Sequence, residues 1–251
     1  MTSDSEQTPL PVQAHEASFW SANRRRPVFL AVLLIGLVLF LIWMPDGARA
    51  SLWWALNLQR GLFALLFLFA LVTLSLIWSA GQRLDSRVFR LFNMRGYPQW
   101  LDRVMWVVTQ LGNMVAACIA VVMLFLLNYQ RLAFVTALGA LTLWLLVETI
   151  KAISVRERPF LTIDKSRVIG WREKGHSFPS GHTSQIFFLT TLFIHHFQPG
   201  VIGTAALYAV ATLVGFTRIY IGAHYPRDVI AGIVLGSVWG MLAALLDPTV
   251  R

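Results

Sequence analysis

The stretch LAFVTALGALTLWLLVETI, residues 132–150, is almost entirely apolar and carries one charged side chain, Glu148. A helix needs about 20 mostly apolar residues to cross the hydrocarbon core of a bilayer. Backbone inside a bilayer must satisfy its own hydrogen bonds, so a run of this length predicts a membrane-spanning helix. Further runs of the same kind lie at residues 28–44, 62–80, 104–128, 183–197, 201–216 and 229–246. The sequence therefore predicts an all-α fold, a polytopic transmembrane helical bundle of six to seven spans.

The composition of the whole chain is typical of a membrane protein. Of its 251 residues, 57% are hydrophobic and 13% are Asp, Glu, Lys or Arg. Soluble domains carry roughly 25% charged residues, so a soluble enzyme or a disordered chain is excluded as the main interpretation. The net charge of +9 is spread over short loops between apolar runs. This distribution favours anionic lipid headgroups or a phosphorylated substrate over nucleic acid as partners.

We divide the chain into three parts. Residues 1–26 form a polar tail that we expect to be flexible. Residues 27–81 carry N-terminal transmembrane anchor helices, and residues 82–251 form the core helical bundle, with a polar loop at 151–179. With seven spans, the basic loops share one side of the membrane with the N-terminus, and the positive-inside rule would place that side in the cytoplasm.

Two smaller patterns predict contacts inside this bundle. Glu148 stands three positions before Lys151, a spacing at which the two side chains can pair on one helix face. Gly232, Gly236 and Gly240 repeat every four residues in the last span, which indicates close packing of that helix against a neighbour.

Three polar motifs lie at span ends that share one side of the membrane. The first is K-x6-R-P from residue 151, the second is SFPSGHT at residues 177–183, and the third is R-x5-H-x3-D from residue 218. Successive spans run in opposite directions, so the end of span four, the start of span five and the turn between spans six and seven emerge on one face. We therefore predict that the three motifs form one site.

The residues of these motifs suit the binding of phosphate. Lys151, Arg158 and Arg218 supply cations, and the two arginines can bind phosphate oxygens bidentately. Ser180 and Gly181 precede a predicted helix, whose free N–H groups and dipole favour an anion. We predict that these five residues hold the phosphate group of a substrate.

Two histidines and one carboxylate can then carry the chemistry. His224 is the better nucleophile, because Asp228 lies in the first turn of the last helix and can orient its ring. His182 is then the general acid. Oxygen-ligand metal sites need several convergent carboxylates, and the motifs hold only Asp228 and Glu157. The sequence therefore predicts a reaction without metal or other cofactor.

In order and spacing, the three motifs resemble the signature motifs of the type 2 phosphatidic acid phosphatase superfamily. The resemblance covers about residues 85–246 and includes Leu101-Asp102 and the run TQLG at 109–112. It implies a phosphohistidine intermediate at His224, with His182 as the acid and loop 151–179 as the catalytic loop. The chain departs from the pattern at Thr217, where the family usually has serine. Many bacterial relatives have six spans and a periplasmic site, so the side of the membrane stays open between periplasm and cytoplasm.

Together these features predict a multi-pass protein of the cell inner membrane that hydrolyses a lipid phosphate or diphosphate. The candidate substrates are undecaprenyl diphosphate, phosphatidylglycerol phosphate and phosphatidic acid, because a site at span ends receives a headgroup whose tail is still in the bilayer. A lipid phosphotransferase that passes the phosphate to an acceptor lipid is one alternative. A non-enzymatic transporter of anionic lipids is another, although it leaves the two histidines without a purpose. The oligomeric state stays open.

Overall fold

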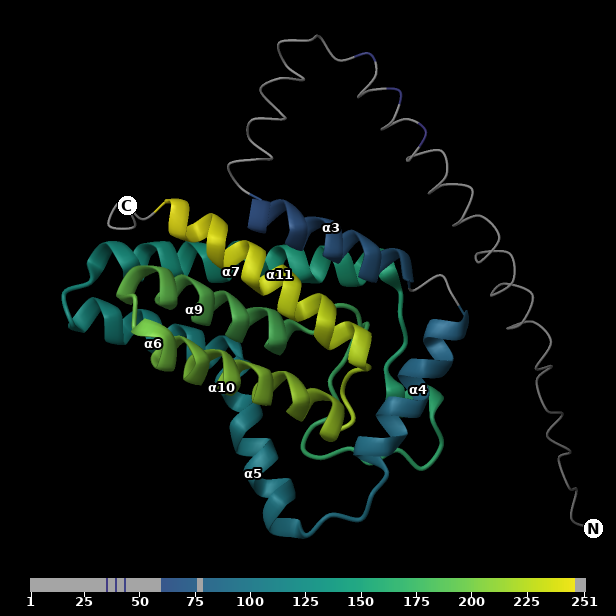
Figure 1. Cartoon of the computed structure of the whole chain (residues 1–251). Coiled ribbons are helices and arrows are strands. Elements are labelled where there is room, and N and C mark those ends of the chain that lie inside the picture. Colours follow the sequence, from purple (N-terminus) through teal and green to yellow (C-terminus); the bar gives the residue numbers. More distant parts are fainter. Residues whose placement is uncertain (1–34, 36–38, 40–42, 44–59, 76–78, 247–251) are drawn as a thin grey trace, which may run out of the picture. The chain divides into compact units, whose positions relative to one another are not determined.

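The structure, a computed structural model, describes residues 60–75 and 79–246, together with the single residues Ile35, Leu39 and Trp43. The chain divides into two units, residues 1–58 and 59–251, and the helices described below belong to the second. In chain order they are α3 (Arg60–Ser75), α4 (Ser79–Asn93), α5 (Gln99–Thr109), the 3-10 helix η1 (Gln110–Gly112), α6 (Met114–Leu126), α7 (Gln130–Ser154), α8 (Pro159–Thr162), α9 (Gly181–Phe197), α10 (Gly200–Tyr220) and α11 (Pro226–Leu245) (Figure 1). The described residues contain no strand, which confirms the all-α prediction for this part of the chain.

Several of these helices have the length and composition of membrane spans. Among the described residues, three helical segments are long and apolar enough to cross a bilayer: 130–162, α10 and α11. A fourth candidate span consists of two halves, α5 with η1 and then α6, if these bent halves are counted as one span. The predicted span at 28–44 lies outside the described residues apart from Ile35, Leu39 and Trp43. A total of six to seven spans therefore stays a prediction.

The predicted span at 104–128 is not one straight helix. Its two halves, α5 with η1 and α6, meet at Asn113 and are bent by 57°. The Asn113 backbone is extended, and its side chain accepts a hydrogen bond from the Ala116 amide at 2.8 Å. An asparagine in this position caps a new helix, so the predicted span is interrupted where Asn113 starts α6.

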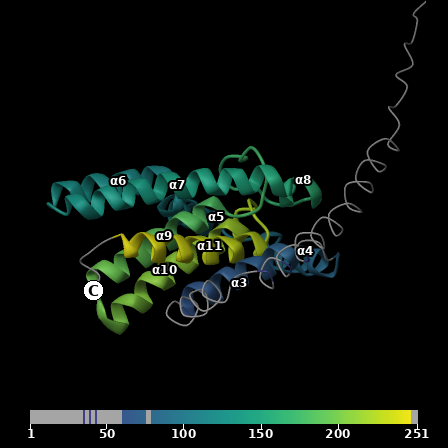
Figure 2. The ribbon, with the colours of Figure 1, turned by 90° about the horizontal axis from the view of Figure 1, so that it is seen from above.

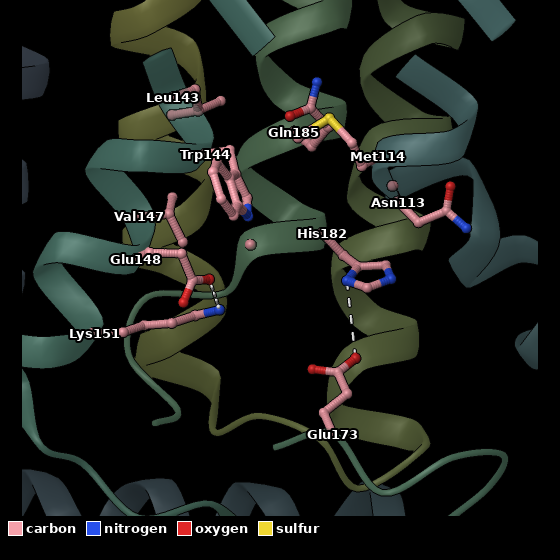
Figure 3. Close-up of a pocket in the computed structure, with 12 residues that line it drawn as sticks. Asn113, Met114, Leu143, Trp144, Val147, Glu148, Lys151, Glu173, His182 and Gln185 are labelled. Carbon is pink, nitrogen blue, oxygen red and sulfur yellow. Dashed lines mark hydrogen bonds and ion pairs between the residues drawn. The ribbon is translucent and has the colours of Figure 1, made fainter. Parts of the chain in front are cut away.

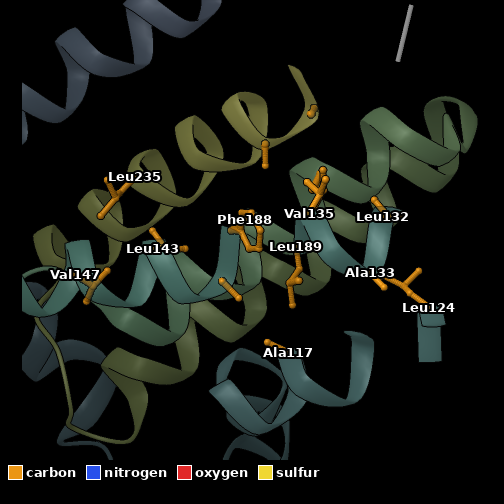
Figure 4. Packing of buried hydrophobic residues seen from close by; sticks show 14 residues of the cluster. Ala117, Leu124, Leu132, Ala133, Val135, Leu143, Val147, Phe188, Leu189 and Leu235 are labelled. Carbon is orange, nitrogen blue, oxygen red and sulfur yellow. The ribbon is translucent and has the colours of Figure 1, made fainter. Parts of the chain in front are cut away.

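Helix α9 is the centre of the described bundle. Helices α11, α10 and α7 pack against it, and α3 packs on α11 (Figures 1 and 2). The largest buried cluster joins Leu143 of α7, Phe188 and Leu192 of α9, and Leu235 of α11 (Figure 4). Nine residues of α9 between Thr183 and Leu192 are buried, among them the polar Ser184 and Gln185, and this burial places α9 inside the bundle.

Large apolar side chains cover the outer faces of the same helices. Ile119, Val122 and Phe125 of α6 are exposed, and Val201 and Ile202 at the start of α10 are 87% exposed. Soluble monomers rarely expose contiguous apolar patches of more than a few hundred Å². An apolar outer surface of this kind suits the hydrocarbon of a bilayer, and it agrees with a membrane protein.

The contact between α9 and α11 depends on the three glycines of α11. A Cβ atom placed on Gly236 would lie 2.2 Å from the Ser184 carbonyl oxygen, and one on Gly232 would lie 2.8 Å from the Ser180 carbonyl oxygen. A Cβ on Gly240 would lie 2.6 Å from the Thr191 Cβ. The backbones therefore approach as closely as only glycine allows, which confirms the predicted close packing.

Replacing Gly236 by alanine is expected to destabilise the protein by about 1–3 kcal/mol, the usual cost of an extra methyl group in a tightly packed contact. The measurement is thermal unfolding of the detergent-purified protein. Gly61→Ala is the matched control, since a Cβ there meets only the Met241 Cε at 3.8 Å. Alanine favours a helix over glycine by up to about 1 kcal/mol, so the control should unfold at an equal or higher temperature. Equal losses in both variants would contradict the close contact.

Candidate active site

The three predicted motifs meet at one end of the bundle. Helix α7 ends there with Lys151 in its last turn, α9 begins there at Gly181, and α10 ends there and turns into α11. The loop from α7 to α9 passes the same place. A cavity of about 190 Å³ opens beside it, lined by residues of α7, α9, the α5–α6 junction and the loop residue Glu173 (Figure 3).

His224 lies at the bottom of the site, and its side chain is 1% exposed. Its Nδ1 lies 2.7 Å from the carbonyl oxygen of Ser177. A carbonyl only accepts hydrogen bonds, so Nδ1 carries the proton and Nε2 keeps its lone pair. Nε2 faces Arg158, whose Nη1 lies 3.3 Å away. The ring is therefore held in the tautomer that a nucleophilic histidine needs.

Asp228 lies next to His224 but positions it differently from the prediction. Its Oδ2 is 3.7 Å from the His224 Nδ1, too far for a hydrogen bond. The carboxylate instead accepts hydrogen bonds from the Ser177 hydroxyl and, at 2.9 Å, from the Tyr225 amide. The Ser177 amide in turn donates to the Arg156 carbonyl at 2.7 Å. Asp228 therefore holds Ser177, and the carbonyl of Ser177 holds the ring.

The sequence did not single out Arg156, which completes this support. Its guanidinium contacts Asp228 and Asp85, each at 2.5 Å, and lies 4.4 Å from the centroid of the Tyr225 ring. The cation therefore compensates two buried carboxylates. In the sequence, Arg156 is marked only by its position two residues before Arg158. Because an arginine at a span end is usually an interfacial anchor, this position did not indicate a role in the site.

Arg158 and Arg218 come together, as predicted, and both are almost completely buried. Arg158 donates to the carbonyl oxygens of Ala223, Lys174 and Gly175 at 3.1, 3.3 and 3.1 Å. Arg218 donates to the Thr109 hydroxyl at 2.9 Å. Among the described residues, the buried Nε of Arg218 has no hydrogen-bond partner. The two guanidinium groups are close enough to contact the same carboxylate, that of Glu173.

The other predicted phosphate-binding residues, Lys151, Ser180 and Gly181, differ in whether their polar groups already have partners. Lys151 pairs with Glu148 at 2.8 Å, as predicted, and its Nζ would lie 3.8 Å from a Cβ placed on Gly181. Gly181 is the first residue of α9, where amides lack partners within the helix. Ser180 differs, because its amide donates to the Asp228 carbonyl at 3.0 Å and its hydroxyl pairs with the Thr183 hydroxyl. In this arrangement Ser180 shapes the turn, and both of its polar groups are occupied.

Glu173 is the residue in the middle of the site, and the sequence did not point to it. Its Oε2 lies 2.9 Å from the Arg158 Nη1, and its Oε1 contacts the Arg218 Nη2. The carboxylate lies 3.8 Å from the His224 Nε2 and 3.9 Å from the His182 Nδ1 (Figure 3). Burial alone would raise the pKa of Glu173, but the neighbouring His224 and His182 rings and the charge of Arg218 hold that pKa well below its usual range. Between Arg172 and Lys174, this acid looked like part of a solvated loop.

Among residues 60–75 and 79–246, no group of three or more His, Cys, Asp or Glu side chains is placed to hold a metal ion. Both carboxylates of the site, Glu173 and Asp228, are already paired with arginines.

The chain is similar to several known proteins. Residues 128–251 match the model of the PAP2 superfamily. The chain is 25% identical over 193 residues to the undecaprenyl-diphosphatase of Sulfolobus acidocaldarius, a match that covers 74% of this chain and 90% of that protein. It is 39% identical over 70 residues to the lipid A 1-phosphatase of Rhizobium johnstonii, a match that covers 28% of each protein. Among solved structures, a transmembrane PAP2-type phosphatidylglycerolphosphate phosphatase from Bacillus subtilis superposes with a TM-score of 0.65 at 24% identity, over 76% of this chain and 97% of that one.

Proposed function

We propose, from the premise that this chain belongs to the PAP2 superfamily, that it is an integral-membrane phosphatase acting on a lipid phosphate or diphosphate. One observation carries the proposal: Arg158 and Arg218 hold an anion, the carboxylate of Glu173, within 4 Å of the ring nitrogens of two histidines. A phosphoryl group in that space would be gripped by two buried arginines and would face a nucleophilic nitrogen. The relatives named above act on undecaprenyl diphosphate, lipid A and phosphatidylglycerolphosphate, which supports a lipid as the substrate.

The first step of the proposed reaction is the transfer of the phosphoryl group to His224. The Nε2 lone pair attacks phosphorus, a nitrogen–phosphorus bond forms, and the bond from phosphorus to the lipid oxygen breaks. His182 donates a proton to the departing oxygen. Arg158 and Arg218 balance the charge of the transferred group, and such preorganised donors supply much of the stabilisation of a transition state.

The second step is the hydrolysis of the phosphohistidine. His182, now unprotonated, accepts a proton from a water molecule while the water oxygen attacks phosphorus. The nitrogen–phosphorus bond breaks, and inorganic phosphate and the free His224 ring result. Throughout both steps Asp228 and Ser177 keep the Nδ1 side of the ring in place, so that Nε2 returns to the same position.

The finer organisation is part of the proposal. Residues 1–26 would be a polar tail, residues 27–81 an anchor, and residues 82–251 the catalytic bundle with its loop at 151–179, in an inner-membrane protein of six to seven spans. The positive-inside rule favours a cytoplasmic site and the family resemblance a periplasmic one. A topology tag at each terminus distinguishes these two orientations.

Purified protein is expected to release inorganic phosphate from at least one of undecaprenyl diphosphate, phosphatidylglycerol phosphate, phosphatidic acid and lipid A in detergent micelles. The rate should be the same, within about twofold, with and without EDTA, because general acid and nucleophilic catalysis by histidine requires no metal. Absence of release from every lipid would contradict the proposed function. A loss of activity in EDTA that added Mg²⁺ restores would contradict only the metal-independent mechanism. Labelled phosphate that appears on a second lipid in place of solution would identify a phosphotransferase.

A further inference from the structure

The carboxylate of Glu173 occupies the space in which the proposed reaction needs phosphate. Its two oxygens bind one arginine each, Oε2 at Arg158 and Oε1 at Arg218. The reacting atoms of a near-attack arrangement lie about 3–3.5 Å apart, and Oε2 is already 3.8 Å from the attacking Nε2 of His224. A phosphoryl group in line with that nitrogen would overlap the carboxylate and repel it. The two anions therefore cannot share the site.

The site also shows why a phosphate would displace this carboxylate. Glu173 satisfies the Nη2 of Arg218, yet the Nε on the same edge of that guanidinium is buried and has no partner among the described residues. A carboxylate has two oxygens, and both are already used by the two arginines. A phosphoryl group presents three, so one of them can reach the Arg218 Nε and complete the bidentate contact. The buried arginine pair is therefore only partly satisfied by Glu173.

The position of Glu173 in the chain allows it to leave. Its side chain is 29% exposed, whereas both arginines are 1% exposed. It lies between Gly170 and Gly175, whose φ angles of 82° and 79° are in the left-handed region that glycine adopts without strain. Its neighbours Arg172 and Lys174 are exposed to solvent. A rotation of the side chain toward solvent would free both arginines and leave the hydrogen bonds from Arg158 to the Lys174 and Gly175 carbonyl oxygens in place.

We propose that Glu173 is an autoinhibitory residue, a tethered anion that holds the phosphate site when it is empty and competes with every anion that enters. This inference rests on the proposed function. An anion without a tail, such as the product phosphate, has only its contacts with the site to displace the carboxylate. Displacement of the carboxylate lowers the affinity for both ligands by the same factor, but a lipid substrate adds the binding of its tail and linker. A lipid phosphate can therefore still occupy the site at concentrations at which free phosphate does not.

Replacing Glu173 by glutamine tests this inference, because the amide is neutral and nearly isosteric. Inorganic phosphate is titrated into the detergent-purified full chain by calorimetry, and its inhibition of lipid hydrolysis is measured in parallel. Glu173→Gln should bind phosphate about tenfold more tightly than the unchanged protein, since it removes one ionic competitor. Glu157→Gln is the matched control, an exposed acid of the same loop, and should bind phosphate as the unchanged protein does.

The sign of the effect decides between the competing role and a merely structural one. If Glu173 only held the arginines in place, its loss would weaken phosphate binding, and that result, or an unchanged affinity, would overturn the inference. Glu173→Asp gives a second test, because a side chain one methylene shorter cannot reach both arginines and should show an intermediate gain in affinity. Phosphate release from lipid by the unchanged protein is a separate measurement, so the proposed function can stand when this inference fails.

Discussion

Asparagine in place of His224 is expected to reduce phosphate release from lipid by at least about a thousandfold, because removal of a nucleophile leaves only binding and electrostatic contributions to catalysis. Asparagine is the sharpest replacement that the structure offers. Its amide nitrogen can take the place of Nδ1 and keep the hydrogen bond to the Ser177 carbonyl, so only the Nε2 that faces Arg158 is lost. The initial rate with the best lipid substrate is the measurement.

The control for this variant is His195→Asn. His195 lies in the last turn of α9, at the end remote from the site, and its Nδ1 pairs with the Thr191 carbonyl at 2.8 Å. Its replacement should leave the rate unchanged. Rapid quenching with labelled substrate should trap protein-bound phosphate in the unchanged protein and in the control, but none in His224→Asn. More than a few per cent of residual activity in that variant would show that another group attacks phosphorus.

Lysine in place of Arg218 is expected to lower kcat/KM for lipid hydrolysis by about a hundredfold. Lysine keeps the positive charge but loses the planar fork that binds two phosphate oxygens, and loss of one preorganised donor costs about 10²–10³ in rate. The Thr109 hydroxyl would also lose its donor on the opposite side of the guanidinium. The values of kcat and KM are determined separately, since a donor that acts mainly in the transition state lowers kcat more than it raises KM.

Arg172→Lys is the matched control for the arginine variant, because Arg172 is exposed on the loop that carries Glu173. It should retain the kinetic constants of the unchanged protein. If Arg218→Lys behaved in the same way, charge alone would suffice at this position and the bidentate contact would have no role.

The sequence predicted which residues form the site better than it predicted which hydrogen bonds they make. His182, His224, Arg158 and Arg218 meet as expected, because motifs at the ends of antiparallel spans must emerge together. The sequence predicted that Asp228 pairs directly with His224. In the structure the carboxylate, which lies in the first turn of α11, accepts hydrogen bonds from the Tyr225 amide and the Ser177 hydroxyl instead. Ser180 was assigned to phosphate, but the turn before α9 uses both of its polar groups. Sequence spacing indicates which groups share a site and does not say which hydrogen bond each one makes.

The fold shows the same division. The apolar runs predicted the helices. Hydropathy did not predict the break at Asn113, because the break depends on one side chain that caps α6. The glycines of α11 predicted a close contact, and the structure identified the partner as α9. Periodicity describes one helix at a time, so the partner of a packing face cannot be read from it.

By itself, the sequence determined that this chain is a helical membrane protein and which residue types can bind and attack a phosphoryl group. Those conclusions depend on local properties: the length of apolar runs and the chemistry of side chains at span ends. Only the tertiary structure decided that Glu173, from a loop that looked solvated, lies between Arg158 and Arg218, and that Arg156 compensates Asp85 and Asp228. The physical reason is that ion pairing depends on distance in space, and these partners are separated by tens of residues along the chain.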